Sequence, residues 1–474
     1  MKNEIKQLVF YTIGPFLSKM LSFVLLPIVS YFISVRDYGF YTLFLLLISY
    51  FQPIITLSTE QYYLRAYDSQ SAVTLRNVLF RLFTLILVIG VVISLILGFV
   101  QILSTFYVCM SILALLVSYF TAVQDLYVRS LRFHNMGGQY SLITAITQMA
   151  VFISTLAIVL TFKTVWGLIY GQLIGVMASL IYTKIVLNKQ MAKLEQKKYL
   201  GKFNVVLKKG LIYSLPLFPG VFLWVVQNTI GRVVISDHAY LLGIYGIGFK
   251  FATITNLFIT SFILYWEPKI YQQYDKLQVK KIKKSDYIAY VNKYKDLYST
   301  IIEFLMLSLV LILPILMLTM QKNYRVAGYI LPIMILNSYI HGYDYFAGFG
   351  PQLTGKTILT IFPLLIALLL NVGLVSTGDY DLLLKVNVAA NASMLILLIG
   401  NKLISDRISI NVSLLKDIIK IICYNIIAIV FYLSHSYILV LVGFLIIFVV
   451  FNLNSIIVGI MFVKNQILNR RRTS

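Results

Sequence analysis

Charged side chains are scarce in this chain of 474 residues, at 12% of the total against about 25% in a typical soluble protein. Acidic residues are the scarcest, because 17 Asp and Glu stand against 40 Lys and Arg, a formal net charge of +23. Hydrophobic residues make up 59% of the chain, and the mean hydropathy is +0.86. This composition excludes a soluble globular protein and predicts an all-α polytopic membrane protein.

Cysteine and the signatures of catalysis are also rare. Cys109 and Cys423 lie in apolar runs, so we expect neither a disulfide framework nor a thiolate metal site. The segment 350–357 fits the phosphate-loop pattern G-x-x-x-x-G-K-T, but that pattern works between a strand and a helix of a soluble sheet, and here apolar runs flank it. We therefore expect no ATP binding, no cofactor, no metal and no enzymatic activity. Transport would be coupled to a gradient of H⁺ or Na⁺ or to the membrane potential.

Long apolar runs predict fourteen transmembrane helices. Their ranges are 9–33, 39–58, 79–99, 102–123, 140–160, 164–187, 211–235, 241–265, 299–320, 326–348, 357–377, 382–404, 415–433 and 437–463. A cytoplasmic N-terminus puts about 32 basic residues on one side and about four, Arg36, Lys163, Lys322 and Arg325, on the other. The positive-inside rule therefore predicts that both termini are cytoplasmic. The two most basic loops are interpreted as topology determinants on helix extensions, with no nucleic-acid partner.

The chain repeats itself at an offset of about 204 positions. This offset superposes Pro15 on Pro219, Gly39 on Gly243 and Tyr41 on Tyr245. Six predicted helices separate the matching points, so the halves share one orientation and are related by an axis along the membrane normal. We predict six-helix bundles at 1–205 and 206–410, followed by two additional helices and a basic tail at 411–474. Transporters built in this way bind substrate between the halves.

Three cations lie far from the ends of the predicted helices, where each costs several kcal/mol unless it faces a cavity or a partner. They are Lys19, Arg232 and Lys250. The acids Glu60, Asp125, Glu267, Glu303 and Asp344 are all predicted near cytoplasmic helix ends. A cation exporter needs a carboxylate at depth, so deep cations without deep acids favour an anionic cargo. Lys19 could instead extend its long side chain to the interface.

Amide and aromatic side chains accompany these cations. They are Trp224, Gln227 and Asn228 in the range 211–235, Trp266, and Asn337, Tyr339, His341, Tyr343, Asp344 and Tyr345 in the range 326–348. Aromatic faces and amides are suited to contact sugar rings. Tyrosine is also common as an anchor at membrane interfaces, and a lone histidine is more often structural than a titrating group.

Loose motifs in a fixed order extend over most of the chain. They are Pro15, the hairpin 35–41, Arg65, the stretches 129–133, 213–217, 243–245 and 266–268, Tyr324 with Ala327, and 355–357. With this order and spacing, the chain resembles the polysaccharide repeat-unit flippases of the Wzx type. These belong to the MOP (multidrug/oligosaccharidyl-lipid/polysaccharide) exporter superfamily, which has a MATE-like fold. One departure is that Gly231 precedes Arg232, where such proteins often carry Asp.

The resemblance implies two six-helix bundles in a V shape, two extra helices and a cationic central cavity. It implies that alternating access carries undecaprenyl-pyrophosphate-linked oligosaccharide from the cytoplasmic to the outer leaflet of a bacterial plasma membrane, for O-antigen, capsule or another surface glycan. Glycosyltransferases and a glycan polymerase would be partners, besides the bilayer. The alternatives are a lipid II flippase or a drug antiporter of the same fold. A membrane-embedded glycan polymerase or ligase is less favoured, because the longest loops are predicted to be cytoplasmic.

Overall fold

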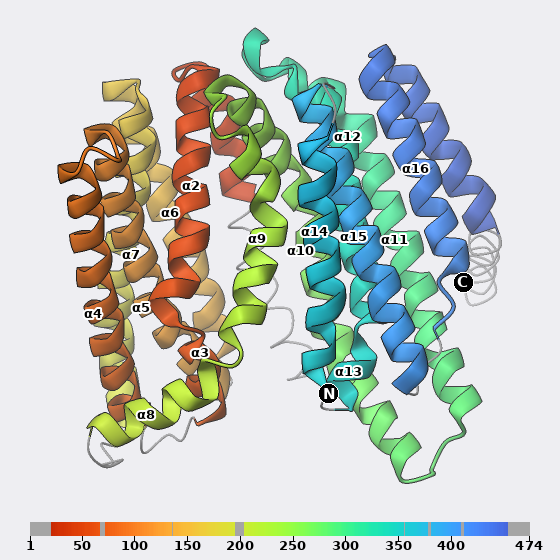
Figure 1. Ribbon diagram of the computed structural model, residues 1–474, viewed down its shortest axis with the longest axis horizontal. Coiled ribbons are helices and arrows are strands. Elements are labelled where there is room, and N and C mark those ends of the chain that lie inside the picture. The colour runs from red at the N-terminus through yellow and green to blue at the C-terminus, as the bar shows by residue number, and fades with distance from the viewer. Residues whose placement is uncertain are drawn as a thin grey trace, which may run out of the picture. The chain divides into compact units, whose positions relative to one another are not determined.

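The computed structural model describes residues 20–66, 72–134, 136–194, 203–354, 356–377, 381–408 and 412–453, and all regular elements among them are helices (Figure 1). Eleven helices are long and apolar enough to cross a membrane, and Met20–Ser30 and Tyr437–Leu453 are shorter apolar helices. With α12 (Ala327–Ala347), each of the fourteen predicted ranges contains a helix. The all-helical, polytopic fold is therefore confirmed.

The first compact unit consists of Met1–Ile247 and Met320–Tyr324. Its labelled helices are α2 (Val35–Thr56), α3 (Thr59–Arg65), α4 (Ala72–Phe99), α5 (Thr105–Phe133), α6 (Gly137–Phe162), α7 (Val165–Leu194), α8 (Phe203–Ser214), α9 (Phe218–Ile235) and the start of α10 (Ala239–Gln278). Helices α6 and α7 approach closely because Gly171 and Gly175 have no side chain. A Cβ at either position would overlap the Cα atoms of Thr155 and Val151, respectively.

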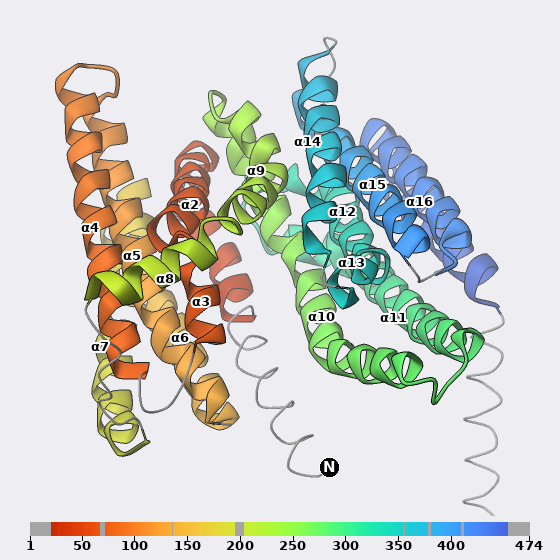
Figure 2. The same cartoon turned by 60° about the horizontal axis from the view of Figure 1, so that its bottom comes forward.

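The predicted single helix 211–235 is wrong, because the structure divides it into α8 and α9. Pro216 lacks an amide N–H and lies between the two helices, and Pro219 occupies the first turn of α9, where that amide is not needed. Helix α8 lies across the ends of α3 and α4 (Figure 2). It buries Val206, Gly210 and Ser214, spaced by four residues, and exposes Lys208 and Lys209. These basic residues therefore lie on a helix that covers one end of the unit.

Helices α2 and α10 cross at two glycines that the repeat makes equivalent. A Cβ on Gly39 would overlap the carbonyl oxygen of Ala239, and a Cβ on Gly243 would overlap the carbonyl oxygen of Val35. Val35 and Ala239 are themselves 204 positions apart. Each glycine thus approaches the residue equivalent to the one that the other glycine approaches, as expected for a twofold internal repeat. The bundle boundaries at 205/206 and 410/411 stay predictions.

The second compact unit consists of Gly248–Thr319 and Arg325–Ser474. It holds the rest of α10, α11 (Lys284–Leu318), α12, α13 (Phe349–Leu353), α14 (Ile361–Ser376), α15 (Leu382–Ile408), α16 (Leu415–Ser434) and the helix Tyr437–Leu453. Helix α12 is buried along most of its length and contacts α11, α15 and α16. Helices α10 and α11, of 40 and 35 residues, extend well beyond their predicted ranges. Most of the basic stretch 269–295 is therefore helical.

Candidate functional site

The structure describes two of the three predicted deep cations, each in its own unit. Arg232 lies on α9 of the first unit and is 7% exposed. Lys250 lies on the part of α10 that belongs to the second unit and is half-buried. Lys19 lies outside the described residues. The shared role of these cations stays a prediction.

Hydroxyl groups from α9, α2 and α10 lie near Arg232. Thr229 is one turn before Arg232 on the same face of α9, and its hydroxyl donates to the Tyr50 hydroxyl at 2.8 Å. Tyr50 and Tyr245 are close enough to the guanidinium to interact with it electrostatically. We call Tyr50, Thr229, Arg232 and Tyr245 the Arg232 cluster. It places a buried guanidinium beside hydroxyl groups, and a guanidinium is suited to bind an anion.

The other predicted residues of α9 differ in how they use their polar groups. The Gln227 side chain is buried, at 3% exposure. Asn228 is half-buried, and its Nδ2 donates to the carbonyl oxygen of Trp224 at 2.7 Å, within the same helix. Part of the hydrogen-bonding capacity of Asn228 is therefore already used by its own backbone.

The predicted polar residues of α12 point in several directions. Tyr339 is fully buried and donates to Glu303 Oε1 at 2.8 Å. Asp344 Oδ1 instead accepts from Asn401 Nδ2 on α15 at 2.8 Å. The His341 ring contacts the Tyr345 ring at 5.0 Å between centroids, and Asn337 is half-buried. The structure therefore distributes these side chains over different neighbours, and of this stretch Tyr339 and Tyr343 join the cluster described next.

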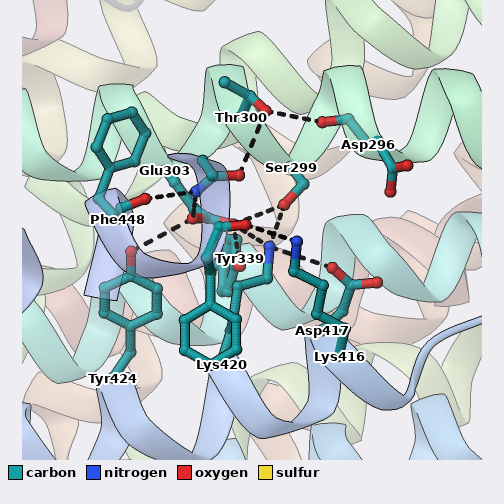
Figure 3. A network of polar contacts seen from close by, with 12 residues as sticks. Asp296, Ser299, Thr300, Glu303, Tyr339, Lys416, Asp417, Lys420, Tyr424 and Phe448 are labelled. Atoms are coloured by element: carbon teal, nitrogen blue, oxygen red, sulfur yellow. Dashed lines mark hydrogen bonds and ion pairs between the residues drawn. The ribbon is translucent and has the colours of Figure 1, made fainter. Parts of the chain in front are cut away.

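Two carboxylates and two lysines form a charge-balanced cluster inside the second unit. Figure 3 labels three of the four: Glu303, Asp417 and Lys420. Lys420 Nζ on α16 lies 2.6 Å from Glu303 Oε1 on α11. Lys295 Nζ on α11 lies 2.6 Å from Asp417 Oδ2 on α16, and Lys420 also lies 3.2 Å from Asp417 Oδ1. All four side chains are at most 5% exposed. Burial of such charges costs little only when opposite charges and hydrogen bonds compensate it, as they do here.

Neutral donors complete the coordination of both carboxylates. Glu303 accepts from Ser299 at 2.6 Å and from Asn452 Nδ2 at 2.6 Å, besides Tyr339. Tyr424 donates to Glu303 Oε2 at 3.4 Å, and Tyr343 donates to Asp417 Oδ1 at 3.1 Å. Lys420 also donates to Ser299. We call the set the Glu303 network: Lys295, Ser299, Glu303, Tyr339, Tyr343, Asp417, Lys420, Tyr424 and Asn452.

The Glu303 network shows that Glu303, predicted near a cytoplasmic helix end, is buried inside the protein. That acids are absent at depth in the membrane stays a prediction. Glu303 is only 1% exposed and lies near the middle of α11, because α11 begins at Lys284 and not near residue 299. Lys295, Ser299 and Glu303 follow one another at four-residue intervals, which places them on one helix face. That spacing was the sequence signal that could have revealed the network. Through it, α16 and the helix Tyr437–Leu453, part of the predicted addition 411–474, dock on α11 and α12.

Comparisons with known proteins agree on the class of fold. Residues 5–270 match the model of a family described as polysaccharide biosynthesis protein. No curated protein matches the chain. The lipid II flippase MurJ in an inward closed conformation is 15% identical, with coverage of 97% of this chain and 100% of MurJ and a TM-score of 0.66.

Two transporters give similar results. An inward-facing multidrug resistance MATE family transporter of the MOP superfamily is 11% identical, with 84% and 95% of the two chains covered and a TM-score of 0.59. A mutant of the Vibrio cholerae MATE transporter VcmN is 13% identical, with 85% and 96% covered and a TM-score of 0.56. At these identities the likeness concerns the fold. The structural neighbours are transporters and a flippase, and the chain shares their multi-pass architecture.

Proposed function

Because the chain belongs to the polysaccharide biosynthesis protein family, we propose that it translocates undecaprenyl-pyrophosphate-linked oligosaccharide repeat units from the cytoplasmic to the outer leaflet of a bacterial plasma membrane by alternating access. It acts as a carrier and not as an enzyme, with both termini in the cytoplasm. The product serves O-antigen, capsule or exopolysaccharide synthesis. Glycosyltransferases that build the cargo and a polymerase that consumes it are the expected partners.

The buried guanidinium of Arg232 is the observation that carries the assignment of the cargo. A guanidinium makes two parallel hydrogen bonds to phosphate oxygens, and it keeps its charge at any physiological pH. Pyrophosphate is the part common to all such cargoes, whatever their sugars. Arg232, Lys250 and Lys19 are therefore assigned to the pyrophosphate, with Trp224, Gln227, Asn228, Asn337, Tyr339, His341 and Asp344 as candidates for contact with sugars.

A lipid II flippase is the second candidate, favoured by the fold that the chain shares with MurJ over its whole length. A drug antiporter is less favoured. Such a transporter needs an interior carboxylate to hold a cationic drug, whereas Glu303 and Asp417 are each paired with a lysine at 2.6 Å.

The test is export in cells that lack their own flippase. Arg232→Gln, Lys250→Gln and Lys19→Gln keep a polar side chain and remove the charge. We expect each variant to lower surface polysaccharide by about tenfold or more and to accumulate lipid-linked cargo. Arg81→Gln and Lys209→Gln are matched controls, because both side chains are exposed. Normal export by Arg232→Gln and Lys250→Gln at normal protein levels would contradict the proposal.

A further inference from the structure

Two open pockets lie next to each other at the end of the first unit where α2 and α10 begin. One has a volume of about 370 Å³ and lies between the turn before α2 and the segment 321–323. The other has a volume of about 390 Å³ and lies between the turn before α10 and Tyr107 at the start of α5. Both volumes fall in the range of small-molecule sites, about 300–1,000 Å³. In Figure 1 this end is opposite to α3 and α8.

Arg36 and Tyr240 line both pockets, and they are 204 positions apart. They are therefore equivalent positions of the internal repeat. Just below them, Gly39 and Gly243 allow the backbones of α2 and α10 to touch. The two pockets are thus related by the repeat. Val35 lines one pocket and Ala239 lines the other, and their carbonyl oxygens are the atoms that Gly243 and Gly39 approach.

The lining combines aromatic rings with planar polar groups. Tyr31, Tyr107 and Tyr240 are 60%, 39% and 47% exposed, so their rings are available as flat surfaces. Arg36 and Asp237 supply a guanidinium and a carboxylate, and Gln321 and Asn323 supply amides. The guanidinium donates hydrogen bonds, the carboxylate accepts them, and the amides do both, so that neighbouring hydroxyl groups of a sugar can be bound in pairs. Aromatic rings pack against the C–H faces of sugar rings.

The charge of the lining separates a saccharide from other ligands. Asp237 faces the same pocket as Arg36, so a bare phosphate would meet repulsion as well as attraction. An apolar drug would contact the rings but would make no hydrogen bonds to the guanidinium, the carboxylate or the amides. A saccharide has C–H faces for the rings and hydroxyl groups that can bond to these polar groups.

We propose that these two pockets, joined at Arg36 and Tyr240, bind the oligosaccharide part of the cargo. This inference rests on the proposed function. Because Arg36 is one of the few basic residues predicted outside, the site receives the glycan on the outer side of the membrane. Recognition of two sugar rings, one in each pocket, would hold the glycan clear of the membrane while the lipid changes leaflet.

The test measures binding to the full-length chain in lipid nanodiscs. The probe is the repeat-unit oligosaccharide freed by mild acid from lipid-linked intermediates of cells that use this chain. We expect Tyr240→Ala and Arg36→Gln to bind it about tenfold more weakly than the wild type. Tyr170→Ala is the matched control, because Tyr170 is 43% exposed and lines neither pocket. Equal affinity of Tyr240→Ala and the wild type, or no binding by the wild type, overturns the proposal.

Inorganic pyrophosphate is the second probe, because the proposed function assigns it to Arg232 and Lys250. We expect Tyr240→Ala to bind pyrophosphate as the wild type does, and a loss would overturn the saccharide assignment. If Arg36→Gln does not fold, the comparison of Tyr240→Ala with the wild type is the test, because Tyr240 is exposed. Weaker oligosaccharide binding by Tyr240→Ala together with normal export by both Arg232→Gln and Lys250→Gln contradicts only the proposed function. Loss of export by Arg232→Gln with unchanged oligosaccharide binding by Tyr240→Ala contradicts only this inference.

Discussion

The Arg232 cluster and the Glu303 network are both buried and polar, but they are built differently. In the Glu303 network, each lysine lies within 2.6 Å of a carboxylate, and hydroxyl and amide donors contact the carboxylates as well. In the Arg232 cluster, the groups near the guanidinium include the phenolic hydroxyls of Tyr50 on α2 and Tyr245 on α10. A balanced network binds helices to one another, whereas a cation among hydroxyl groups is suited to an anionic guest.

This difference separates stability from function. Removal of one charge from a balanced, buried pair leaves the other charge uncompensated, so the penalty falls on folding. Removal of a cation that binds a ligand weakens binding of that ligand. A residue retained for function often lowers the stability of the fold. The two regions therefore predict opposite outcomes when one charge is deleted.

The largest effect is expected for Lys420→Met, which keeps an unbranched four-atom side chain and removes the ammonium. Glu303 would remain 1% exposed without its ion pair. We expect a loss of about 3–5 kcal/mol in the free energy of unfolding. Thermal unfolding of the purified protein in detergent measures it, with Lys208→Met as a control, because Lys208 is an exposed lysine outside the Glu303 network. A melting temperature equal to that of the wild type would show that the network does not stabilise the unit.

A second variant tests whether charge balance, and not the number of polar contacts, matters. The double substitution Glu303→Met with Lys420→Met removes both members of the pair at 2.6 Å. Replacement of a buried ion pair by apolar residues of similar volume is often neutral. We expect the double variant to recover about 2 kcal/mol or more relative to Lys420→Met. Strictly additive losses would contradict the coupling.

A smaller effect is expected at the glycine crossing of the first unit. Gly243→Ala places a methyl group against the carbonyl oxygen of Val35, which is backbone and moves only with α2. We expect a loss of about 1–3 kcal/mol in the free energy of unfolding. Gly138→Ala is the matched control, because a Cβ there meets nothing within 4 Å. Equal stabilities of the two variants would show that α2 and α10 are free to separate.

The sequence predicted the helices well and the contacts between them poorly. Hydropathy located fourteen helices, because apolar length is a local property of the chain. It missed the break at Pro216 and the true start of α11 at Lys284, because polar helix ends are indistinguishable from loops by hydropathy alone. The repeat indicates that Gly39 and Gly243 are equivalent. It does not show that each glycine contacts the other's helix, because that contact depends on how the helices pack.

The two candidate regions differ in the same respect. Arg232 was found because a single cation in an apolar run is conspicuous. The Glu303 network was missed because its partners are remote, with Lys420 and Glu303 separated by 117 positions. A charge at the edge of a predicted span looks solvated until its partner is known.

The smallest effect on stability, and the sharpest contrast with Lys420→Met, is expected for Arg232→Gln. The guanidinium is costly to bury, and glutamine keeps hydrogen-bonding groups beside Tyr50 and Tyr245 without that cost. We therefore expect the free energy of unfolding to change by less than about 1 kcal/mol, or to rise, while export is lost. Thermal unfolding and surface polysaccharide should be measured on the same preparations. If Arg232→Gln lowers the melting temperature as much as Lys420→Met does, Arg232 is a structural residue, and the contrast between the two regions disappears.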